Sequence, residues 1–405
     1  MNISIETYGC SANVNNSEII EGILSKAGHR IVEEKGADFV VINTCTVKGP
    51  TENRIIKRMQ DIKKPIIVTG CMADAQPELI RKIRENAILV SLTNLKSINK
   101  AIEEQKDFLE RNKEIKLELP KKSKNSAIEI IQIAEGCVGN CSFCITKIAK
   151  GDLFSYPEKQ IVEAVRKSSA YEIWLTSQDC GAYGIDRDSS LPKLLKQILA
   201  LKKDFRLRIG MMNPNHVLHF LDELIELYKD KRVFKFLHLP VQSGNDEILK
   251  NMNRRYSVED FKGIVAKLRK EIPDIHISTD IIAGFPGETD KQFNDSYDLI
   301  KEISPDTLNI SKFWPRPKTS AAKMKQVDAV TRNERSRKIK ELHRKISRKQ
   351  NEKWLGRECE VYVDEIREGG IFGRNESYKQ VVLKKGGLGE KVKVRIREAG
   401  MNYIK

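Results

Sequence analysis

The sequence lacks any apolar run long enough to cross a membrane. A transmembrane helix needs about 20 consecutive apolar residues, and no run in these 405 residues approaches that length. The segment 1–9 carries Glu6 and no basic cluster before an apolar stretch, so it resembles a first β-strand and not a secretory leader. We therefore expect a cytoplasmic protein with no membrane partner.

The sequence also lacks internal repeats and low-complexity segments. Its 405 residues exceed what one ordinary core needs, which predicts two to four domains. Basic residues outnumber acidic ones by 72 to 56, a net charge of +16. This excess favours a polyanionic partner, with a lysine-rich surface that serves only solubility as the alternative.

Short apolar strands alternate with helical patterns in two separate series. Residues 1–108 form the first, with strands expected at 3–7, 39–43, 66–69 and 88–92. Such alternation is typical of a parallel α/β sheet. Residues 109–126, rich in Lys and Glu, resemble a linker. Residues 127–330 predict a partial (β/α)6 barrel, with strands at 128–134, 172–176, 206–211, 234–240, 276–282 and 307–313.

The C-terminal part of the chain changes character. A basic connecting helix is expected over 331–346, and the stretch 331–349 has nine Lys/Arg against two Glu. Such a helix could follow nucleic-acid phosphates, or it could be an ordinary solvated helix. Residues 347–405 contain short alternating runs with glycines at the turns, which predicts a small antiparallel β-barrel.

Three cysteines directly after the first barrel strand point to an iron–sulfur centre. Cys137, Cys141 and Cys144 have the spacing C-x3-C-x2-C, with Phe143 before the last. Three thiolates on one loop can bind three irons of a cubane cluster, which leaves the fourth iron open to a reactant, here the amino and carboxylate groups of S-adenosylmethionine. A structural zinc site is the weaker alternative, because no fourth ligand stands nearby.

Three further cysteines occupy matching positions in the N-terminal series. Cys10, Cys45 and Cys71 each follow an expected strand and precede a helix. Because the carboxyl ends of parallel strands meet at one edge, we expect these cysteines to converge on a second cluster. Nearby helix N-termini should favour their thiolate form. The alternative is three separate buried cysteines, and Cys180 and Cys359 are interpreted as ordinary small residues.

Taken with these cysteines, other motifs make the sequence resemble the methylthiotransferase family of radical-SAM enzymes over nearly its whole length. The motifs are TYGCSAN (7–13), NTC (43–45), TGC (69–71), LTSQD (175–179), HLPVQSG (238–244), TDIIAGFPGE (279–288) and PRPKTSAA (315–322). Lys318 and Ser320 depart from the family pattern, which has Gly and Pro there. The tail, with GRNE at 373–376, resembles an RNA-binding TRAM domain.

The resemblance implies two 4Fe-4S clusters and a two-step reaction. One S-adenosylmethionine methylates a sulfur at the N-terminal cluster, and a second supplies the radical that activates an adenine C2. The segments EIWLT (172–176), GAYG (181–184) and RIGMMNP (208–214) resemble the archaeal and eukaryotic branch that acts on N6-threonylcarbamoyladenosine-37 of tRNA. Isopentenyladenosine-37 or a ribosomal-protein side chain are alternative substrates, and a non-catalytic iron–sulfur RNA-binding protein is the alternative from another class.

The resemblance also suggests partners and further site residues. Expected partners are the tRNA anticodon stem-loop and an electron donor such as flavodoxin or ferredoxin. Expected contacts to S-adenosylmethionine, with turn formation as the alternative, are Phe143, Gln178, Asp179, Gln242, Ser243 and Gly284. Candidate contacts to the threonylcarbamoyl carboxylate are Arg208 and Arg316, with a structural salt bridge as the alternative for either. Candidate contacts to RNA are Arg374, Lys384 and Lys385. His238 is expected to be a packing residue.

Overall fold

The computed structural model describes residues 1–405 and begins with a five-stranded parallel sheet. Its strand order is β2-β1-β3-β4-β5, with β1 Asn2–Thr7, β2 Arg30–Ile31, β3 Phe39–Thr44, β4 Ile66–Gly70 and β5 Ile88–Leu89. Helices α1 (Ser11–Lys26) and α5 (Ile98–Glu104), with the 3-10 helix η2 (Leu92–Ser97), cover one face. Helices α2 (Gly49–Asp61), α3 (Cys71–Ala75) and α4 (Pro77–Ile83) lie mainly on the other. A short 3-10 helix, η1 (Glu34–Gly36), precedes β3.

The segment 109–126, expected to be a linker, has no helix or strand but is held against both neighbouring domains. The Lys122 amide donates to the carbonyl of Glu18 in α1 at 2.9 Å. The Lys121 ammonium reaches the carboxylates of both Glu18 and Glu129. Lys116 is buried, and its Nζ donates to Glu135 at 2.6 Å. The segment therefore fixes the two domains together and does not act as a free tether.

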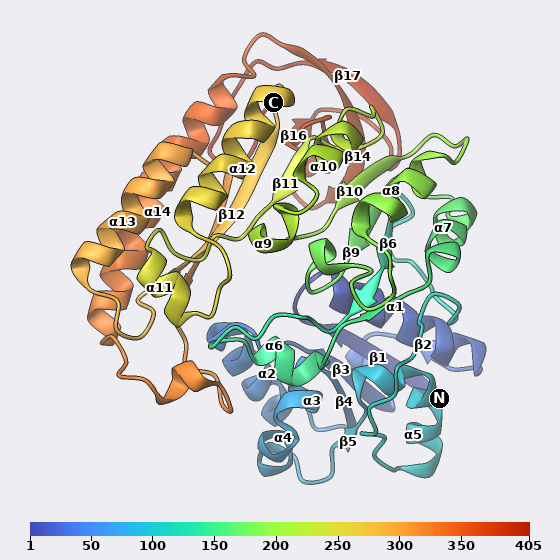
Figure 1. The fold of residues 1–405 in the computed structure, drawn as a ribbon. Helices are drawn as coiled ribbons and strands as arrows, with labels where there is room; N and C mark the ends of the chain where they lie inside the picture. The colour runs from blue at the N-terminus through green and yellow to red at the C-terminus, as the bar shows by residue number, and fades with distance from the viewer.

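The central domain is an open, all-parallel half of a barrel, as the sequence predicts. Its two sheets are β10-β9-β6 and β11-β12-β13, joined by a bridge between Leu207 and Val233. The strands are β6 Ile128–Gln132, β9 Glu172–Thr176, β10 Arg206–Ile209, β11 Phe236–His238, β12 His276–Ala283 and β13 Thr307–Lys312. The small hairpin pair is β7 Ala134–Glu135 and β8 Phe154–Ser155. Figure 1 shows the helices on the outside of the barrel.

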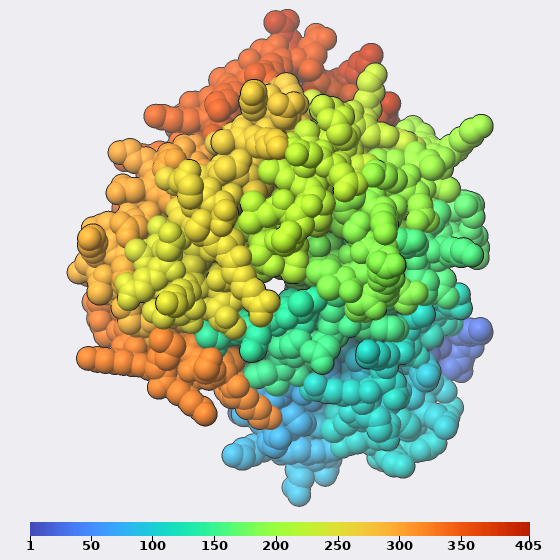
Figure 2. Space-filling view, in the orientation of Figure 1, coloured from blue at the N-terminus to red at the C-terminus, as the bar shows by residue number.

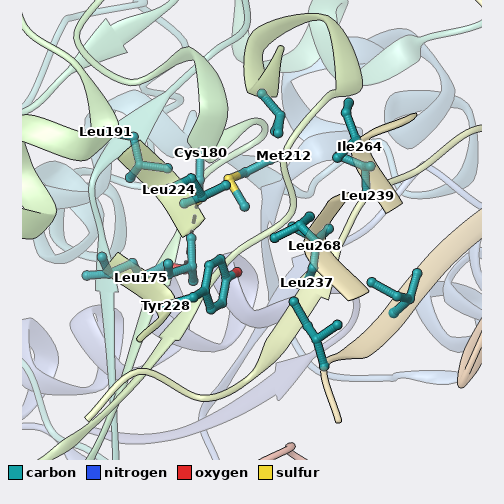
Figure 3. Close-up of a cluster of buried hydrophobic side chains, with 14 of the residues drawn as sticks. Leu175, Cys180, Leu191, Met212, Leu224, Tyr228, Leu237, Leu239, Ile264 and Leu268 are labelled. Carbon is teal, nitrogen blue, oxygen red and sulfur yellow. Dashed lines mark hydrogen bonds between the residues drawn. The ribbon is translucent and has the colours of Figure 1, made fainter. Parts of the chain in front are cut away.

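The outer helices of the barrel are amphipathic and form one large core with the strands. In α8, Leu191, Leu194, Leu195 and Ile198 recur at helical spacing and are fully buried. Figure 3 shows Cys180 among these side chains, beside Met212, which confirms it as a core residue. The helical elements are α6 Ile145–Lys150, α7 Glu158–Lys167, η3 Cys180–Ala182, α8 Leu191–Leu199, α9 Pro214–Val217, α10 Leu221–Tyr228, α11 Asp246–Asn251, α12 Val258–Glu271, α13 Asp290–Ile303, η4 Ser320–Lys323 and α14 Ala329–Glu352.

The C-terminal domain is an antiparallel sheet that closes one end of the barrel. Its strand order is β16-β15-β14-β17, from β14 Glu358–Arg367, β15 Gly370–Arg374, β16 Gln380–Leu383 and β17 Lys391–Arg395. Cys359 lies in its small core with Trp354. Tyr378 is buried against the rings of Trp174, Phe234 and Phe236. These contacts put the domain at the amino ends of the barrel strands, the barrel floor.

The N-terminal domain lies at the opposite end of the barrel (Figure 1). Ser11, which follows β1, is 3.1 Å from Thr176, the last residue of β9, between their hydroxyl oxygens. Helix α3 of the first domain packs on α6 of the second, so that Ile145 and Ala149 share the core that holds Cys71. The carboxyl edges of both sheets therefore face each other. No helix has the length and apolar character required to cross a membrane.

Candidate active site between the two parallel sheets

The loop 136–144 presents three cysteines at the mouth of the barrel. Gly136 has φ +73°, and a Cβ there would collide with the carbonyl oxygen of Asp152, so the turn into the loop requires glycine. The loop is held by backbone hydrogen bonds, from the Cys137 amide to Gly151 at 3.2 Å and from Ser142 to Met252 at 3.1 Å. The sequence places Cys137 at the carboxyl end of the first barrel strand, and the fold keeps it there.

The three thiols of this loop suit a cubane cluster better than a single ion. A Cβ built on Gly139 would lie 3.3 Å from Cys137 Sγ and 3.9 Å from Cys141 Sγ, so both sulfurs face the side of the loop that glycine leaves open. No three Cys, His or carboxylate groups converge at single-ion distances. Each thiolate of a cubane binds a different iron, so its sulfurs stand further apart than the ligands of one ion. The donor set is three thiolates, which is what such a cluster takes.

A cavity of about 190 Å³ borders this loop. Cys141 and Cys144 line it on one side, and Lys318 and Ser320 line it on the other. The two positions that depart from the family pattern therefore lie at the edge of the site. Figure 2 shows an opening on this face, where the green segment that holds the loop meets the yellow segments of the barrel.

Arg254 is a neighbour of this loop that the sequence did not point to. Its Nη1 donates to Cys141 Sγ at 3.5 Å, and its Nη2 donates to the Pro240 carbonyl at 3.0 Å. The Arg254 guanidinium also lies over the Tyr256 ring. A fixed cation thus faces one thiol of the set from a segment more than a hundred residues away.

The N-terminal cysteines gather at the carboxyl edge of the first sheet. Strands β1, β3 and β4 are in register there, with Thr7 beside Asn43 and Thr44 beside Gly70. Cys10 is exposed, whereas Cys45 and Cys71 are buried. A Cβ built on Gly9, next to Cys10 in the chain, would lie 3.3 Å from Cys45 Sγ, and the charges of Cys45 and Cys10 both act on the pKa of Cys71.

Burial outweighs the helix N-termini in setting the state of these thiols. It raises the pKa of Cys71 to about 12 and that of Cys137 to about 11, and it raises the pKa of Cys45 and Cys144 as well. For Cys45 and Cys71, burial thus outweighs the helix N-termini that were expected to favour the thiolate form. Metal binding must displace these protons, and the iron itself then stabilises the thiolates.

A buried polar network holds the N-terminal cysteine loops in place. Asn13 donates to the carbonyls of Tyr8 and Thr44 at 2.6 and 2.8 Å, and Asn43 donates back to the Asn13 carbonyl at 2.8 Å. The Thr44 hydroxyl donates to the Thr69 carbonyl at 2.5 Å and accepts from the Met72 amide at 3.1 Å. The polar residues of the three N-terminal motifs thus bind one another's backbone and fix the spacing of the cysteines between them.

Arg316 joins the two domains and is not a free cation. It is 3% exposed, and its Nη2 donates to Thr46 Oγ1 at 2.5 Å and to the carboxylate of Glu52. Gln76 donates to the same two groups, at 2.5 and 2.7 Å. The pairing with Glu52 favours the alternative for Arg316, a structural salt bridge, over a contact to the substrate carboxylate.

A second set of buried charges lies beside Cys71. Lys116 and Lys150 both donate to Glu135 Oε1, at 2.6 and 3.1 Å. Burial alone would raise the pKa of Glu135, but the two ammonium groups lower it to about 2. Burial opposes the charge on Lys150, yet Glu135 and then Cys71 raise the pKa of Lys150 to about 12. The barrel domain thus places a permanent cation near the N-terminal cysteines.

The expected contacts to S-adenosylmethionine divide into two groups. Asp179 is buried and caps a turn, accepting from the amides of Gly181 at 3.0 Å and Asn213 at 3.1 Å. Ser243 is fully buried against Ser296 of α13. Gly284 donates to Glu288 at 2.8 Å in a tight turn with φ +73°. These three residues have structural partners, which favours the alternative of turn formation for them.

The remaining three candidates keep free surface or free polar atoms. Gln178 Oε1 is buried and has no hydrogen-bond partner. Gln242 has a left-handed backbone, φ 70°, and its backbone N–H donates to the Asp280 carbonyl at 2.8 Å. Its side chain makes no hydrogen bond. Phe143 is half-buried and meets Phe285 edge to face at 6.4 Å. Gln178 and Gln242 are thus the better placed of the polar candidates.

The interior of the barrel is polar near its mouth. Ile277 and Ile281 of β12 face the helices in the main core, so Asp280 faces the interior. Asp280 Oδ1 is 2.9 Å from His238 Nε2 and accepts from Asn309 Nδ2 at 2.7 Å. His238 is hydrogen-bonded, as expected of a packing residue, but about a fifth of its side chain is exposed. These three side chains form a wall with hydrogen-bonding capacity.

Two further predicted contacts serve the floor of the barrel. The Arg208 guanidinium lies over three rings, 4.9 Å from Trp174, 5.0 Å from Phe236 and 5.2 Å from Tyr378. Arg374 donates to Asp364 at 3.1 Å and stacks on the same Tyr378. Neither position suits the predicted contact, because Arg208 lies away from both cysteine sets and Arg374 is engaged within the interface.

The lysines of the C-terminal domain have a different environment. Lys384 and Lys385 are exposed after β16, and no carboxylate pairs with either. They remain available to a polyanion.

Two known protein families match the chain in the regions that hold the cysteines. The Radical SAM superfamily matches residues 131–300, and the uncharacterized protein family UPF0004 matches residues 2–91. Among solved structures, the radical S-adenosylmethionine methyltransferase TsrM from Kitasatospora setae, with cobalamin and a [4Fe-4S] cluster bound, has a TM-score of 0.57 at 14% identity. It covers 79% of this chain and 76% of its own, and this likeness shows the fold alone.

Curated relatives match the whole chain. A protein of Pyrococcus horikoshii named probable threonylcarbamoyladenosine tRNA methylthiotransferase is 41% identical over 99% of this chain and 98% of its own length. The protein of Archaeoglobus fulgidus with the same name is 41% identical over 100% of this chain and 98% of its own. The human threonylcarbamoyladenosine tRNA methylthiotransferase is 37% identical over 100% of this chain and 73% of its own. These matches include both cysteine sets.

Proposed function

Because the chain belongs to the family of threonylcarbamoyladenosine tRNA methylthiotransferases, we propose that it adds a methylthio group to C2 of N6-threonylcarbamoyladenosine at position 37 of tRNA. One observation of the structure carries the proposal. Two sets of three cysteines, Cys10, Cys45 and Cys71 and Cys137, Cys141 and Cys144, lie on the carboxyl edges of two parallel sheets that face each other. Radical formation and sulfur donation can then act on one base.

The residues of the chain divide this work between the two edges. When bound, the cluster at Cys137, Cys141 and Cys144 supplies the electron that cleaves S-adenosylmethionine, and the cluster at Cys10, Cys45 and Cys71 holds the sulfur that is transferred. Gln178 and Gln242 offer polar atoms to the methionine and ribose groups of the cofactor. Arg254 fixes Cys141 with its Nη1, 3.5 Å from the sulfur. The burial of Cys45 and Cys71 excludes water from these two ligands.

The polar wall of the barrel interior favours the threonylcarbamoyl substrate. His238, Asp280 and Asn309 offer donors and acceptors close to the mouth. These side chains bond one another and remain accessible, so a polar threonylcarbamoyl group can form further hydrogen bonds with them, whereas an apolar isopentenyl group cannot. A base in the anticodon loop is unstacked enough to enter such a site, unlike a base within a helix.

We further propose that the protein acts in the cytoplasm and binds tRNA through basic surfaces outside the barrel mouth. Lys384 and Lys385 are exposed on the C-terminal domain. The outer face of α14 carries further exposed cations, Arg337, Lys338, Lys340, Arg344, Lys345, Arg348 and Lys349. Phosphate contacts of this kind position RNA without reading its sequence. A small reductase such as flavodoxin or ferredoxin would supply electrons.

The test offers purified, anaerobically reconstituted protein two tRNAs, one with threonylcarbamoyladenosine-37 and one with isopentenyladenosine-37. Mass spectrometry of the nucleosides should show the 2-methylthio product on the first tRNA only. Protein with alanine at Cys10, Cys45 and Cys71 is the matched control and should give none. A product on the isopentenyl tRNA alone would overturn the substrate, and a product on neither would overturn the activity.

A further inference from the structure

Arg316 has two buried donor atoms that no group of the protein satisfies. Its Nη2 is bonded to Thr46 and Glu52, but its Nε and Nη1 have no hydrogen-bond partner. Four other arginines leave a buried Nε without a partner, but Arg316 is the only one that also leaves Nη1. Buried charged donors are normally paired, so Nε and Nη1 of this guanidinium are positioned to bind an acceptor that the polypeptide does not supply.

The guanidinium of Arg316 lies beside the loop that carries Cys45. Thr46, which accepts from Nη2 at 2.5 Å, directly follows Cys45 in the chain. Gln76 donates to both Thr46 and Glu52, and these contacts fix the orientation of the Arg316 guanidinium.

The barrel domain, and not the domain that carries these cysteines, supplies Arg316. The residue lies between Pro315 and Pro317 in the loop after β13, and both prolines restrict the backbone there. Its Nη2 spans the domain interface to reach α2 and the Cys45 loop. Arg316 therefore reaches the Cys45 loop from the domain on the other side of the interface.

We propose that Arg316 is a positioning residue that donates hydrogen bonds through Nε and Nη1 to the anionic sulfur held at Cys10, Cys45 and Cys71. This inference rests on the proposed function. A planar guanidinium suits the role, because two parallel N–H bonds fix an anion in direction as well as in distance. Hydrogen bonds to cluster sulfurs also raise the reduction potential, because they stabilise the more negative reduced state.

The test isolates the N-terminal cluster in the full chain. In protein with alanine at Cys137, Cys141 and Cys144, the variants Arg316→Gln and Arg316→Lys are reconstituted anaerobically, and iron content and reduction potential are measured. We expect about four irons in each and a shift of the potential to more negative values in Arg316→Gln. Arg335→Gln is the matched control, because Arg335 is also buried and paired with a glutamate, Glu288, but lies away from the cysteines.

With all six cysteines present, Arg316→Gln should lower methylthio transfer by about 10- to 100-fold, the usual cost of losing a group that supports a metal ligand. Formation of 5′-deoxyadenosine should stay at the parent level. An unchanged potential together with unchanged transfer would overturn the role of Arg316. A parent protein that assembles no N-terminal cluster would instead overturn the proposed function.

Arg316→Lys keeps the experiment decisive if Arg316→Gln fails to fold. Lysine retains the charge opposite Glu52 but cannot present two parallel donors. Normal iron content with reduced transfer supports the proposal, whereas full transfer by the lysine variant contradicts it.

Discussion

Replacement of Glu172 by glutamine should stabilise the joint between the barrel and the C-terminal domain above neutral pH. Glu172 begins β9 and is 1% exposed. Its Oε1 accepts from Trp174 Nε1 at 2.5 Å, while Oε2 has no partner. Burial and then the charge of Asp364 raise the pKa of Glu172 to about 7.

The sign of the effect follows from the raised pKa. The folded protein binds the Glu172 proton more tightly than the unfolded chain does. The contribution of Glu172 to stability is therefore complete below its ordinary pKa of 4.5 and is lost as the pH rises through 7. A shift from 4.5 to about 7 corresponds to roughly 3 kcal/mol at pH 8. Glutamine keeps the acceptor for Trp174 and carries no charge, so the variant should avoid this loss.

Hydrogen exchange measures this difference locally, without the assumption of two-state unfolding of a multidomain protein. After correction for intrinsic rates, peptides from β9 and β14 should exchange about 100-fold more slowly in Glu172→Gln than in the parent at pH 8, and at similar rates at pH 5. Glu368→Gln is the control, because Glu368 is exposed on the same C-terminal domain. Identical pH profiles of Glu172→Gln and the parent would refute the reasoning.

Three further predictions test the site and the RNA surface. The protein should bind about eight irons. Alanine at Cys137, Cys141 and Cys144 should remove about half of them and abolish formation of 5′-deoxyadenosine, as measured by iron assay and chromatography. Alanine at Cys10, Cys45 and Cys71 should also remove half of the iron and stop methylthio transfer, but formation of 5′-deoxyadenosine should continue. Methylthio transfer that persists in this variant would contradict a sulfur-donor role for these cysteines. Alanine at both Lys384 and Lys385 should weaken tRNA binding and lower the slope of log affinity against log salt by about 2, and titrations with an unchanged slope would exclude the two lysines from the interface.

The RNA test uses point variants because of what the structure shows at the barrel floor. Deletion of 347–405 would remove Tyr378 and expose Trp174, Phe234 and Phe236. It would also leave Asp306 without Lys379, whose Nζ lies 2.7 Å away. Loss of tRNA binding after such a deletion would report on damage to the barrel, so only surface lysines separate RNA binding from folding.

The strands were predictable because their apolar periodicity is local. Strand β9 has the predicted bounds, and β1, β3 and β4 agree within one residue. Strand β5 ends at Leu89, short of the predicted residue 92, because the chain turns into a 3-10 helix at Leu92. In the C-terminal domain, where glycines were expected at the turns, Gly370 instead begins strand β15.

The supporting residues of the site were not predictable because their partners are distant in sequence. Arg254 meets Cys141 across 113 residues, and Arg316 meets Glu52 across 264. The spacing of residues in a sequence predicts which side chains are neighbours within one loop or along one sheet edge. For this reason it predicted the grouping of the cysteines. Arg208 was interpreted as a substrate contact because an isolated arginine in a motif gives no sign of the three rings that enclose it.

The two ends of the barrel impose one route on the substrate. Tyr378 and Arg208 fill the floor, so a base can approach the interior only at the mouth. Buried ion pairs cross the mouth, with Arg316 on Glu52, and α6 packs on α3 beside Cys71. Separation of the two domains would break these ion pairs and leave charged groups without partners, which costs free energy. The two cysteine sets therefore stay at a fixed separation, so the proposed function requires that one bound pose of the base serve both hydrogen removal and sulfur delivery.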